Sequence, residues 1–225
     1  MAVLEKETGR PLTSAKGQID LLSESRGYEE IQQKRHTKQT ATLQLAASIW
    51  ELTRRNGEGR IVLDQWFAGQ SFGSEQSLES MIASYAGSQE QWIEEACDGL
   101  LGWADPGDRY TAVELCLKIA AAGSSIQKEL IGRLRSIMKK LEIPEDRFQA
   151  LSQKYLTDHV GQMEDPMALL GLTEEMTEDQ VRQKLTAEYR KWNARVTHPN
   201  AAVRQQADRM LNLITQLRSK YAHHA

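Results

Sequence analysis

The sequence predicts an all-α fold, and three observations support that prediction. Apolar residues recur at helical spacing along most of the chain, as at Leu43, Ala46 and Trp50. Runs of alternating β-branched residues, which are typical of strands, are almost absent. The 225 residues include 15 glycines and 5 prolines, so few positions interrupt a helix. With 40% hydrophobic and 26% charged residues, the chain has the composition of a globular protein rather than of a disordered one.

Residues 38–157 are expected to form a helical bundle. Two turn signals, at residues 56–59 (Asn-Gly-Glu-Gly) and 105–108 (Asp-Pro-Gly-Asp), divide the apolar pattern, and Pro144 restarts a helix in its first turn. Short connections between about seven helices are the pattern of a compact bundle. The preceding residues, 1–37, are polar with sparse apolar positions, and they are predicted to be an N-terminal arm outside the bundle.

A polar linker, residues 158–164, is expected to separate the bundle from a C-terminal module, residues 165–225. A short helix in this module should end at Gly171, because glycine is favoured just after a helix end. Thr177, followed three residues later by glutamine, fits a capping box that opens a long helix. Pro199 should break that helix, because proline disfavours helical geometry in the residue before it. The module is therefore predicted to be a pair of long helices with a short helix across them.

Three motifs follow one another in this module. They are residues 165–172 (Asp-Pro-Met-Ala-Leu-Leu-Gly-Leu), residues 189–191 (Tyr-Arg-Lys) and residues 198–200 (His-Pro-Asn). Their order and spacing resemble those of a J domain, the helical module of DnaJ-type co-chaperones. In that family a His-Pro-Asp loop and a basic second helix engage the ATPase domain of an Hsp70-type chaperone and stimulate its hydrolysis of ATP.

The resemblance implies a set of partner-binding residues in the loop and on the second helix. The set is His198, Pro199, Asn200, Arg182, Lys184, Arg190, Lys191 and Arg195. Asn200 stands where the family carries aspartate. Asparagine keeps the size of that residue but removes its charge, and a charge-assisted hydrogen bond is roughly twice as strong as a neutral one. We therefore expect weak or absent ATPase stimulation by this chain.

The charge distribution agrees with a binding surface in this module. Residues 178–225 contain nine Lys or Arg and four Asp or Glu, a net charge of +5, so the other 177 residues carry −8 of the overall −3. A basic pair of helices can steer an acidic partner toward it. The alternative is a solvated face that pairs with the acidic residues of the protein's own bundle.

Two other resemblances are present. Residues 197–207 read like part of a HEAT repeat, in which His198 and Pro199 would be turn residues only, but such arrays need several copies and no second copy occurs. In the bundle, the turns at residues 58–64 and 122–129 form a pseudo-repeat that resembles the TerB fold of tellurite-resistance proteins. A TerB-like body followed by a J-like module is an arrangement seen in membrane-anchored DnaJ-like co-chaperones.

Turn acids have been linked to metal binding in TerB proteins, but no metal is expected in this chain. The first turn carries Glu58 and the second carries Ala122 at that place, which is too few oxygen ligands for Ca²⁺. No cofactor is expected either, because no glycine-rich phosphate loop occurs. The five histidines have no sequence neighbours that suggest a catalytic triad or a metal cluster. We therefore expect no catalytic residue and no enzymatic activity.

The sequence also limits the cellular locations and the classes of partner that are expected. No apolar run approaches the roughly 20 residues that cross a bilayer, so membrane insertion is not expected. The first residues lack the features of a secretion signal, which favours a cytoplasmic location with Cys97 and Cys116 as reduced, buried thiols. Nucleic acid is not an expected partner, because the helical phase of Tyr189 and Trp192 predicts core positions rather than base stacking.

Together these observations favour a non-catalytic protein-interaction adaptor that resembles a DnaJ-type co-chaperone. Its basic J-like helix and His-Pro-Asn loop would dock on an Hsp70-type chaperone or on a protein of a larger complex. The alternative is a structural or assembly subunit that uses the J-like fold as a scaffold and does not stimulate an Hsp70.

Overall fold

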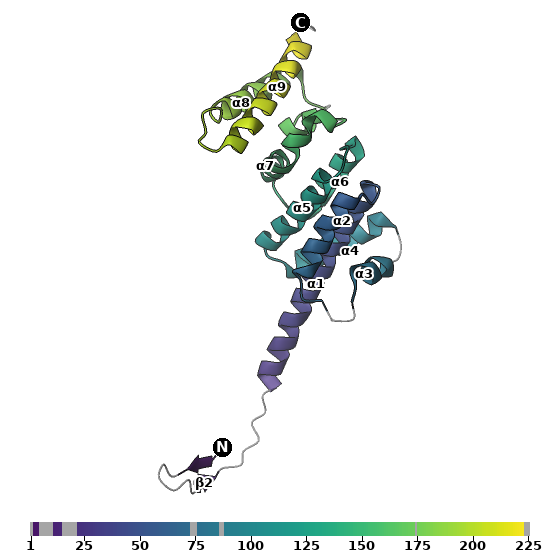
Figure 1. Cartoon of the computed structure of the whole chain (residues 1–225), viewed down its shortest axis with the longest axis vertical. Helices are drawn as coiled ribbons and strands as arrows, with labels where there is room; N and C mark the ends of the chain where they lie inside the picture. Colours follow the sequence, from purple (N-terminus) through teal and green to yellow (C-terminus); the bar gives the residue numbers. More distant parts are fainter. Residues whose placement is uncertain are drawn as a thin grey trace. The chain divides into compact units, whose positions relative to one another are not determined.

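The computed structural model describes six ranges of the chain (Figure 1). The ranges are residues 2–4, 11–14, 22–72, 76–85, 88–173 and 175–222, with side chains between residues 27 and 220. The chain divides into two compact units, residues 1–35 and 36–225, and each is described by itself. Much of the predicted N-terminal arm lies outside the described residues.

The all-α prediction is confirmed for the described residues, in which nine α-helices and two short 3-10 helices carry most of the chain. The exception lies in the first unit, where the strands β1 (Ala2–Leu4) and β2 (Pro11–Ser14) pair in antiparallel register. The sequence pattern did not predict this pair. Helix α1 (Leu22–Leu52) begins in the first unit and continues into the second.

Short polar residues begin the next four helices, as capping chemistry predicts. The side chains of Asn56, Ser77, Ser88 and Asp105 each accept a hydrogen bond from a backbone N–H group in the first turn. These bonds satisfy donors that a helix leaves unpaired at its start. The helices are α2 (Gly57–Ala68), α3 (Leu78–Ser84), α4 (Gln89–Trp103) and α5 (Pro106–Ala121).

The later helices begin and end close to the predicted positions. Pro144 is the N-cap residue of α7, one position before the predicted first turn. Gly171 ends a short helix with a φ of +65°, a left-handed conformation that glycine adopts without a steric penalty. The first long C-terminal helix ends at Asn193 and the next begins at Ala201, so the helical conformation is interrupted around Pro199. The elements are α6 (Lys128–Lys140), α7 (Glu145–Leu156), η1 (Thr157–Gln162), η2 (Pro166–Leu170), α8 (Glu178–Asn193) and α9 (Ala201–Ala222).

The residues predicted as a linker are held by hydrogen bonds to the bundle. Residues 157–162 form η1, and the backbone N–H of Ile126 donates to the carbonyl of Gln162 at 3.1 Å. The N–H of Glu164 donates back to the carbonyl of Ile126 at 3.0 Å, and its carboxylate accepts from the N–H of Lys128 at 2.9 Å. This segment is therefore attached to the start of α6.

A hydrophobic core runs through the described residues of the second unit. It includes Ile49 from α1, Leu117 from α5 and Leu134 from α6, each fully buried. It continues into the C-terminal helices, where Trp192 and Met210 are also fully buried. Helix α8 packs against α9, while α9 also contacts η1. The C-terminal helix pair and the bundle thus share buried apolar surface, the main stabilising contribution to folding.

The two turns of the bundle's pseudo-repeat lie against each other. A Cβ atom added at Gly123 would lie 3.4 Å from Nδ2 of Asn56, which places the second turn beside the first. Space at the first turn is tighter. A Cβ atom at Gly59 would lie 2.7 Å from Oδ1 of Asn56 and 3.0 Å from Cδ1 of Trp50. Glycine at position 59 is therefore required for the cap that starts α2.

Both cysteines are free thiols and both are buried, as predicted. Burial raises the pKa of Cys97 to about 11, and it raises the pKa of the completely enclosed Cys116 further. Within the described ranges, none of the helices combines the length and the hydropathy that a membrane span requires.

Candidate protein-interaction surface

Helix α8 turns one face into the core and the other to solvent. Thr177 and Gln180 form the predicted capping box, in which each side chain bonds the backbone N–H of the other residue. Val181 and Leu185 are buried on the inner face, and Trp192 continues that face with no exposed surface. The helix is thereby fixed in rotation, so the residues on its opposite face, such as Arg182, Thr186 and Arg190, are exposed to solvent.

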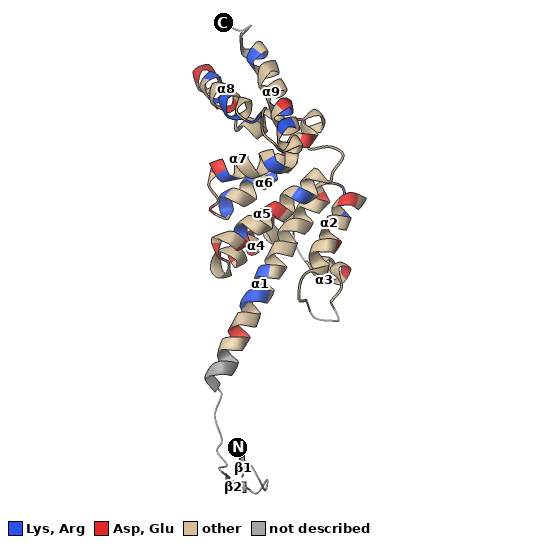
Figure 2. Cartoon of the chain, turned by 60° about the vertical axis from the view of Figure 1, so that its left-hand side comes forward, with Lys and Arg blue, Asp and Glu red and all other residues tan. Residues whose placement is uncertain are grey.

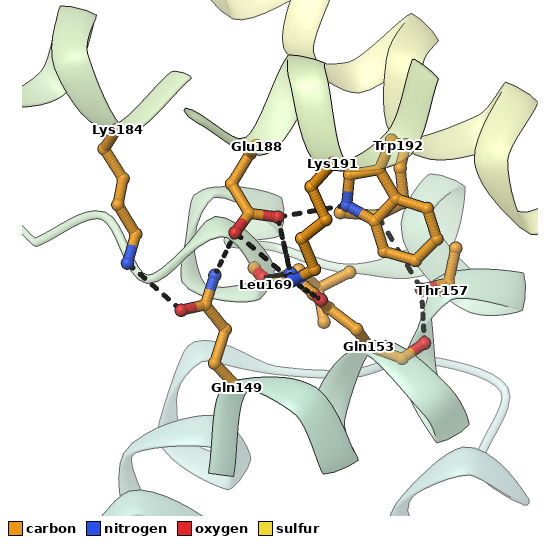
Figure 3. Close-up of polar contacts among 9 residues, drawn as sticks. Gln149, Gln153, Thr157, Leu169, Lys184, Glu188, Lys191 and Trp192 are labelled. Carbon is orange, nitrogen blue, oxygen red and sulfur yellow. Dashed lines mark hydrogen bonds and ion pairs between the residues drawn. The ribbon is translucent and has the colours of Figure 1, made fainter. Parts of the chain in front are cut away.

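A buried carboxylate, Glu188, lies on the inner face among these apolar residues (Figure 3). Its side chain is surrounded by donors from two helices. Oε2 accepts from Nε1 of Trp192 at 3.0 Å and from Nε2 of Gln153 at 3.1 Å, and Oε1 accepts from Nε2 of Gln149 at 3.2 Å. Nζ of Lys191 lies 3.3 Å from both oxygens. We refer to these five residues as the Glu188 network.

The Glu188 network also ties α8 to the segment before it. Nε2 of Gln153 donates to the carbonyl of Leu169 at 2.8 Å, and Oε1 of Gln153 accepts from Lys191 at 2.8 Å. The backbone carbonyl of Gln153 accepts from the hydroxyl of Thr157 at 2.5 Å and from Nε2 of Gln206 at 2.5 Å. Polar groups from α7, η2, α8 and α9 are thus paired in one buried cluster, which specifies how these elements pack.

Three of the predicted partner-binding residues contribute to this internal structure. Lys191 belongs to the Glu188 network, and Nζ of Lys184 donates to Oε1 of Gln149 at 3.1 Å. The guanidinium of Arg195 stacks on the buried indole of Trp192, with its carbon 4.6 Å from the ring centroid. Their positive charges therefore have partners within the chain.

Arg182 and Arg190 lie on the exposed face of α8 instead. Together with Gln183, Thr186 and Ala187 they line an open depression of about 350 Å³. Residues four apart on a helix share a face, so the small side chains at 186 and 187 separate the two guanidinium groups. Arg182 lies 3.6 Å from the carboxylate of Glu178, whereas Arg190 has no ion-pair partner among the described residues. Figure 2 shows basic residues on both α8 and α9.

Tyr189 and Arg218 lie beside this depression. Tyr189 was predicted to be a core residue, and that prediction is wrong, because 36% of its surface is exposed. The guanidinium carbon of Arg218 lies 4.6 Å from the centroid of the Tyr189 ring. Nη2 of Arg218 also donates to Oγ1 of Thr186 at 3.4 Å. Helix α9 thus adds a third guanidinium to the exposed face of α8. The core prediction for Trp192 is confirmed.

The loop that joins α8 to α9 exposes all three residues of the His-Pro-Asn motif. Oδ1 of Asn200 accepts from the backbone N–H of Ala202 at 2.9 Å, so Asn200 caps the start of α9. Nδ1 of His198 accepts from the N–H of Asn200 at 3.1 Å. Arg204 closes the loop by donating to the carbonyls of His198 and Pro199 at 2.8 and 2.9 Å. The motif is therefore an ordered turn presented to solvent.

The histidine and acidic residues that the sequence raised as metal or catalytic candidates are dispersed among the described residues. Among them, no group of three or more His, Cys, Asp or Glu residues could hold a metal ion. The ring of His198 has the backbone of Asn200 as its neighbour and no carboxylate partner within the described part of the chain. Glu58 lies exposed in the first turn of α2, where a negative charge interacts favourably with the helix dipole.

Comparisons of the chain with protein-family models, with curated proteins and with solved structures found no match.

Proposed function

We propose that this chain is a non-catalytic protein-interaction adaptor that docks through the exposed face of α8 and the loop after it. The observation that carries the proposal is the pair of exposed guanidinium groups, Arg182 and Arg190, on a helix whose opposite face is anchored by the Glu188 network. A rigid helix loses little conformational freedom on binding, and cations on its surface favour an acidic partner.

The first candidate partner is the ATPase domain of an Hsp70-type chaperone. Support comes from the resemblance of residues 165–200 to a J domain, together with the order of elements in this region: a short helix ended by Gly171, a capped basic helix and an exposed His-Pro-Asn turn. The two free, buried cysteines suit a reducing compartment such as the cytoplasm.

The role of Asn200 makes the proposal testable. Its side chain caps α9 through an oxygen atom that aspartate also has, so Asn200→Asp restores the family's charge without removing the cap. The experiment measures ATP hydrolysis by an Hsp70-type chaperone from the same source, with the wild-type chain and with the Asn200→Asp variant. We expect little stimulation by the wild type and increased stimulation by the variant. If neither protein binds or stimulates the chaperone, the co-chaperone proposal fails.

A second candidate function is a structural subunit that uses the same helices as a scaffold. The observation that favours it is that Lys184, Lys191 and Arg195 are engaged within the chain, while the hydrophobic core continues from the bundle into α8 and α9. This function predicts a complex of fixed stoichiometry that persists after reversal of the charges at Arg182 and Arg190. The adaptor function predicts that the same reversal abolishes the complex.

A further inference from the structure

A groove of about 740 Å³ lies between α6, the segment after η1 and the start of α8. Its apolar lining consists of Met167, Leu172, Met176 and Val181. Leu172 and Val181 are nearly buried, at 4% and 3% exposed, whereas the two methionines are half-buried. Methionine side chains are flexible and polarisable, so they adapt to apolar groups of different shape. The lining is therefore suited to receive an apolar side chain.

The charged residues of the groove are mostly acidic. Four carboxylates, from Glu164, Asp165, Glu175 and Glu178, line it together with two cations. Glu164 and Asp165 each accept one backbone N–H bond within the chain. Because a carboxylate can accept about four hydrogen bonds, these groups keep the capacity to bind a further donor. The groove thus combines an apolar floor with a net negative rim.

One of the two cations, Arg135, has incomplete hydrogen bonding. Nε lies 3.5 Å from the carboxylate of Glu145, and neither Nε nor Nη2 has a hydrogen-bond partner although both atoms are buried. A third of the Arg135 side chain is exposed, and the side chain lines the groove. A backbone carbonyl placed in the groove would supply an acceptor when the guanidinium turns toward it.

We propose that this groove binds a peptide segment of a partner protein in which an apolar side chain is flanked by lysine or arginine. The apolar side chain would contact the Met167–Met176 floor, the flanking cations would pair with the carboxylates, and a backbone carbonyl would accept from Arg135. The basic face of α8 suits an acidic partner, whereas the acidic groove suits a basic one. The groove is therefore a second surface, for a different kind of segment. Peptide binding in the groove does not require that α8 bind an Hsp70-type chaperone.

The test uses the full chain with ¹³C-labelled methionine methyl groups. The probe is a blocked octapeptide with two leucines between two pairs of Lys-Arg, and two control peptides replace either the cations by glutamate or the leucines by serine. We expect the probe to shift the methyl signals of Met167 and Met176 and to leave those of the buried Met138 and Met210 in place. Neither control peptide should produce these shifts, and added salt should weaken the binding of the probe.

Variants test whether the groove itself is the site. Met176→Lys places a cation on the floor and Glu175→Lys reverses a rim charge, and each should weaken probe binding by about tenfold or more. Asp98→Lys, an exposed charge reversal on α4, should leave the affinity unchanged. Three results overturn the proposal: no shift with the probe, equal binding of the acidic peptide, or unchanged affinity in the two groove variants. Methionine shifts that depend on chain concentration alone would identify a second copy as the occupant and would equally overturn it.

Discussion

Glu188 determines how α8 is held against α7. The residue occupies a position on the apolar stripe of α8, between Leu185 and Trp192, and its carboxylate accepts hydrogen bonds from side chains of both helices. Burial of a charge is costly unless it is paired and hydrogen-bonded, and here the surrounding donors meet that condition. The network therefore specifies one rotation of α8, and this rotation directs Arg182 and Arg190 to solvent.

Replacing Glu188 by glutamine should destabilise the protein by about 2 kcal/mol, because the new amide group directs donors toward the donors of Gln149, Gln153 and Trp192. Glu178→Gln is the matched control at an exposed position of the same helix, and it should change stability by less than ~0.5 kcal/mol. Urea unfolding followed by circular dichroism measures both values. Equal stability of the two variants would contradict the structural role of the network.

The buried cysteines should react slowly in the folded protein. The thiolate is the reactive form, and a pKa of about 11 at Cys97 leaves about one hundredth of the thiolate that an ordinary thiol has at pH 8. We expect slow modification by a disulfide reagent in buffer, faster modification as the pH rises toward 10, and rapid reaction of both cysteines in urea. Rapid reaction of either thiol in the native protein at pH 8 would be inconsistent with the burial described above.

Among the secondary-structure elements, helix starts and ends were predicted well because their chemistry is local. The capping box of Thr177 and Gln180 and the helix end at Gly171 each involve residues within one turn of the chain. Both predictions are confirmed. The Glu188 network was not predicted, because Gln149 and Gln153 lie 39 and 35 residues before Glu188 and only the packing of α7 on α8 brings them together. An acidic residue on an otherwise apolar helical stripe is the one signal that could have indicated it.

The first turn of α2 offers a matched pair of glycines, Gly57 and Gly59. Gly59→Ala would place a Cβ atom 2.7 Å from the capping oxygen of Asn56 and should destabilise the protein by about 1–2 kcal/mol. Gly57→Ala meets nothing within 4 Å and should be neutral or slightly stabilising. Thermal unfolding of both variants distinguishes a steric requirement at position 59 from a general preference for glycine in the turn, which would make the two changes equally costly.

The cap at the start of α9 separates the structural role of Asn200 from its role in binding. Asn200→Ala removes the acceptor for the N–H of Ala202 and should cost about 1 kcal/mol of stability. Asn200→Asp keeps the acceptor and should leave stability within ~0.5 kcal/mol of the wild type, because a negative charge at a helix N-terminus is favourable. Urea unfolding checks both values. A large loss in the aspartate variant would show that the turn needs the amide group.

At the scale of the whole molecule, the all-α fold followed from apolar periodicity, but the packing of the C-terminal helices did not. The composition of residues 158–164 predicts a polar linker, yet this segment forms backbone hydrogen bonds with Ile126. The hydrophobic core also extends from α7 to Trp192 and Met210. Periodicity shows which face of a helix is buried and not which helix covers it. For the same reason the sequence did not show which basic residues have partners within the chain. Lys184, Lys191 and Arg195 have such partners, whereas Arg182 and Arg190 lie on the exposed face of α8.

We propose that the exposed face of α8 docks on an acidic partner, with an Hsp70-type ATPase domain as the first candidate. Calorimetric titration of that domain measures this docking directly. The titrated proteins are the wild-type chain, the Arg182→Glu/Arg190→Glu variant and a matched Lys139→Glu/Arg147→Glu control. Lys139 and Arg147 are exposed on α6 and α7, so the control carries the same change in net charge. We expect the wild type and the control to bind, and the α8 variant to lose affinity by about tenfold or more. Absence of binding by the wild type, or equal affinity of all three proteins, would contradict the proposal.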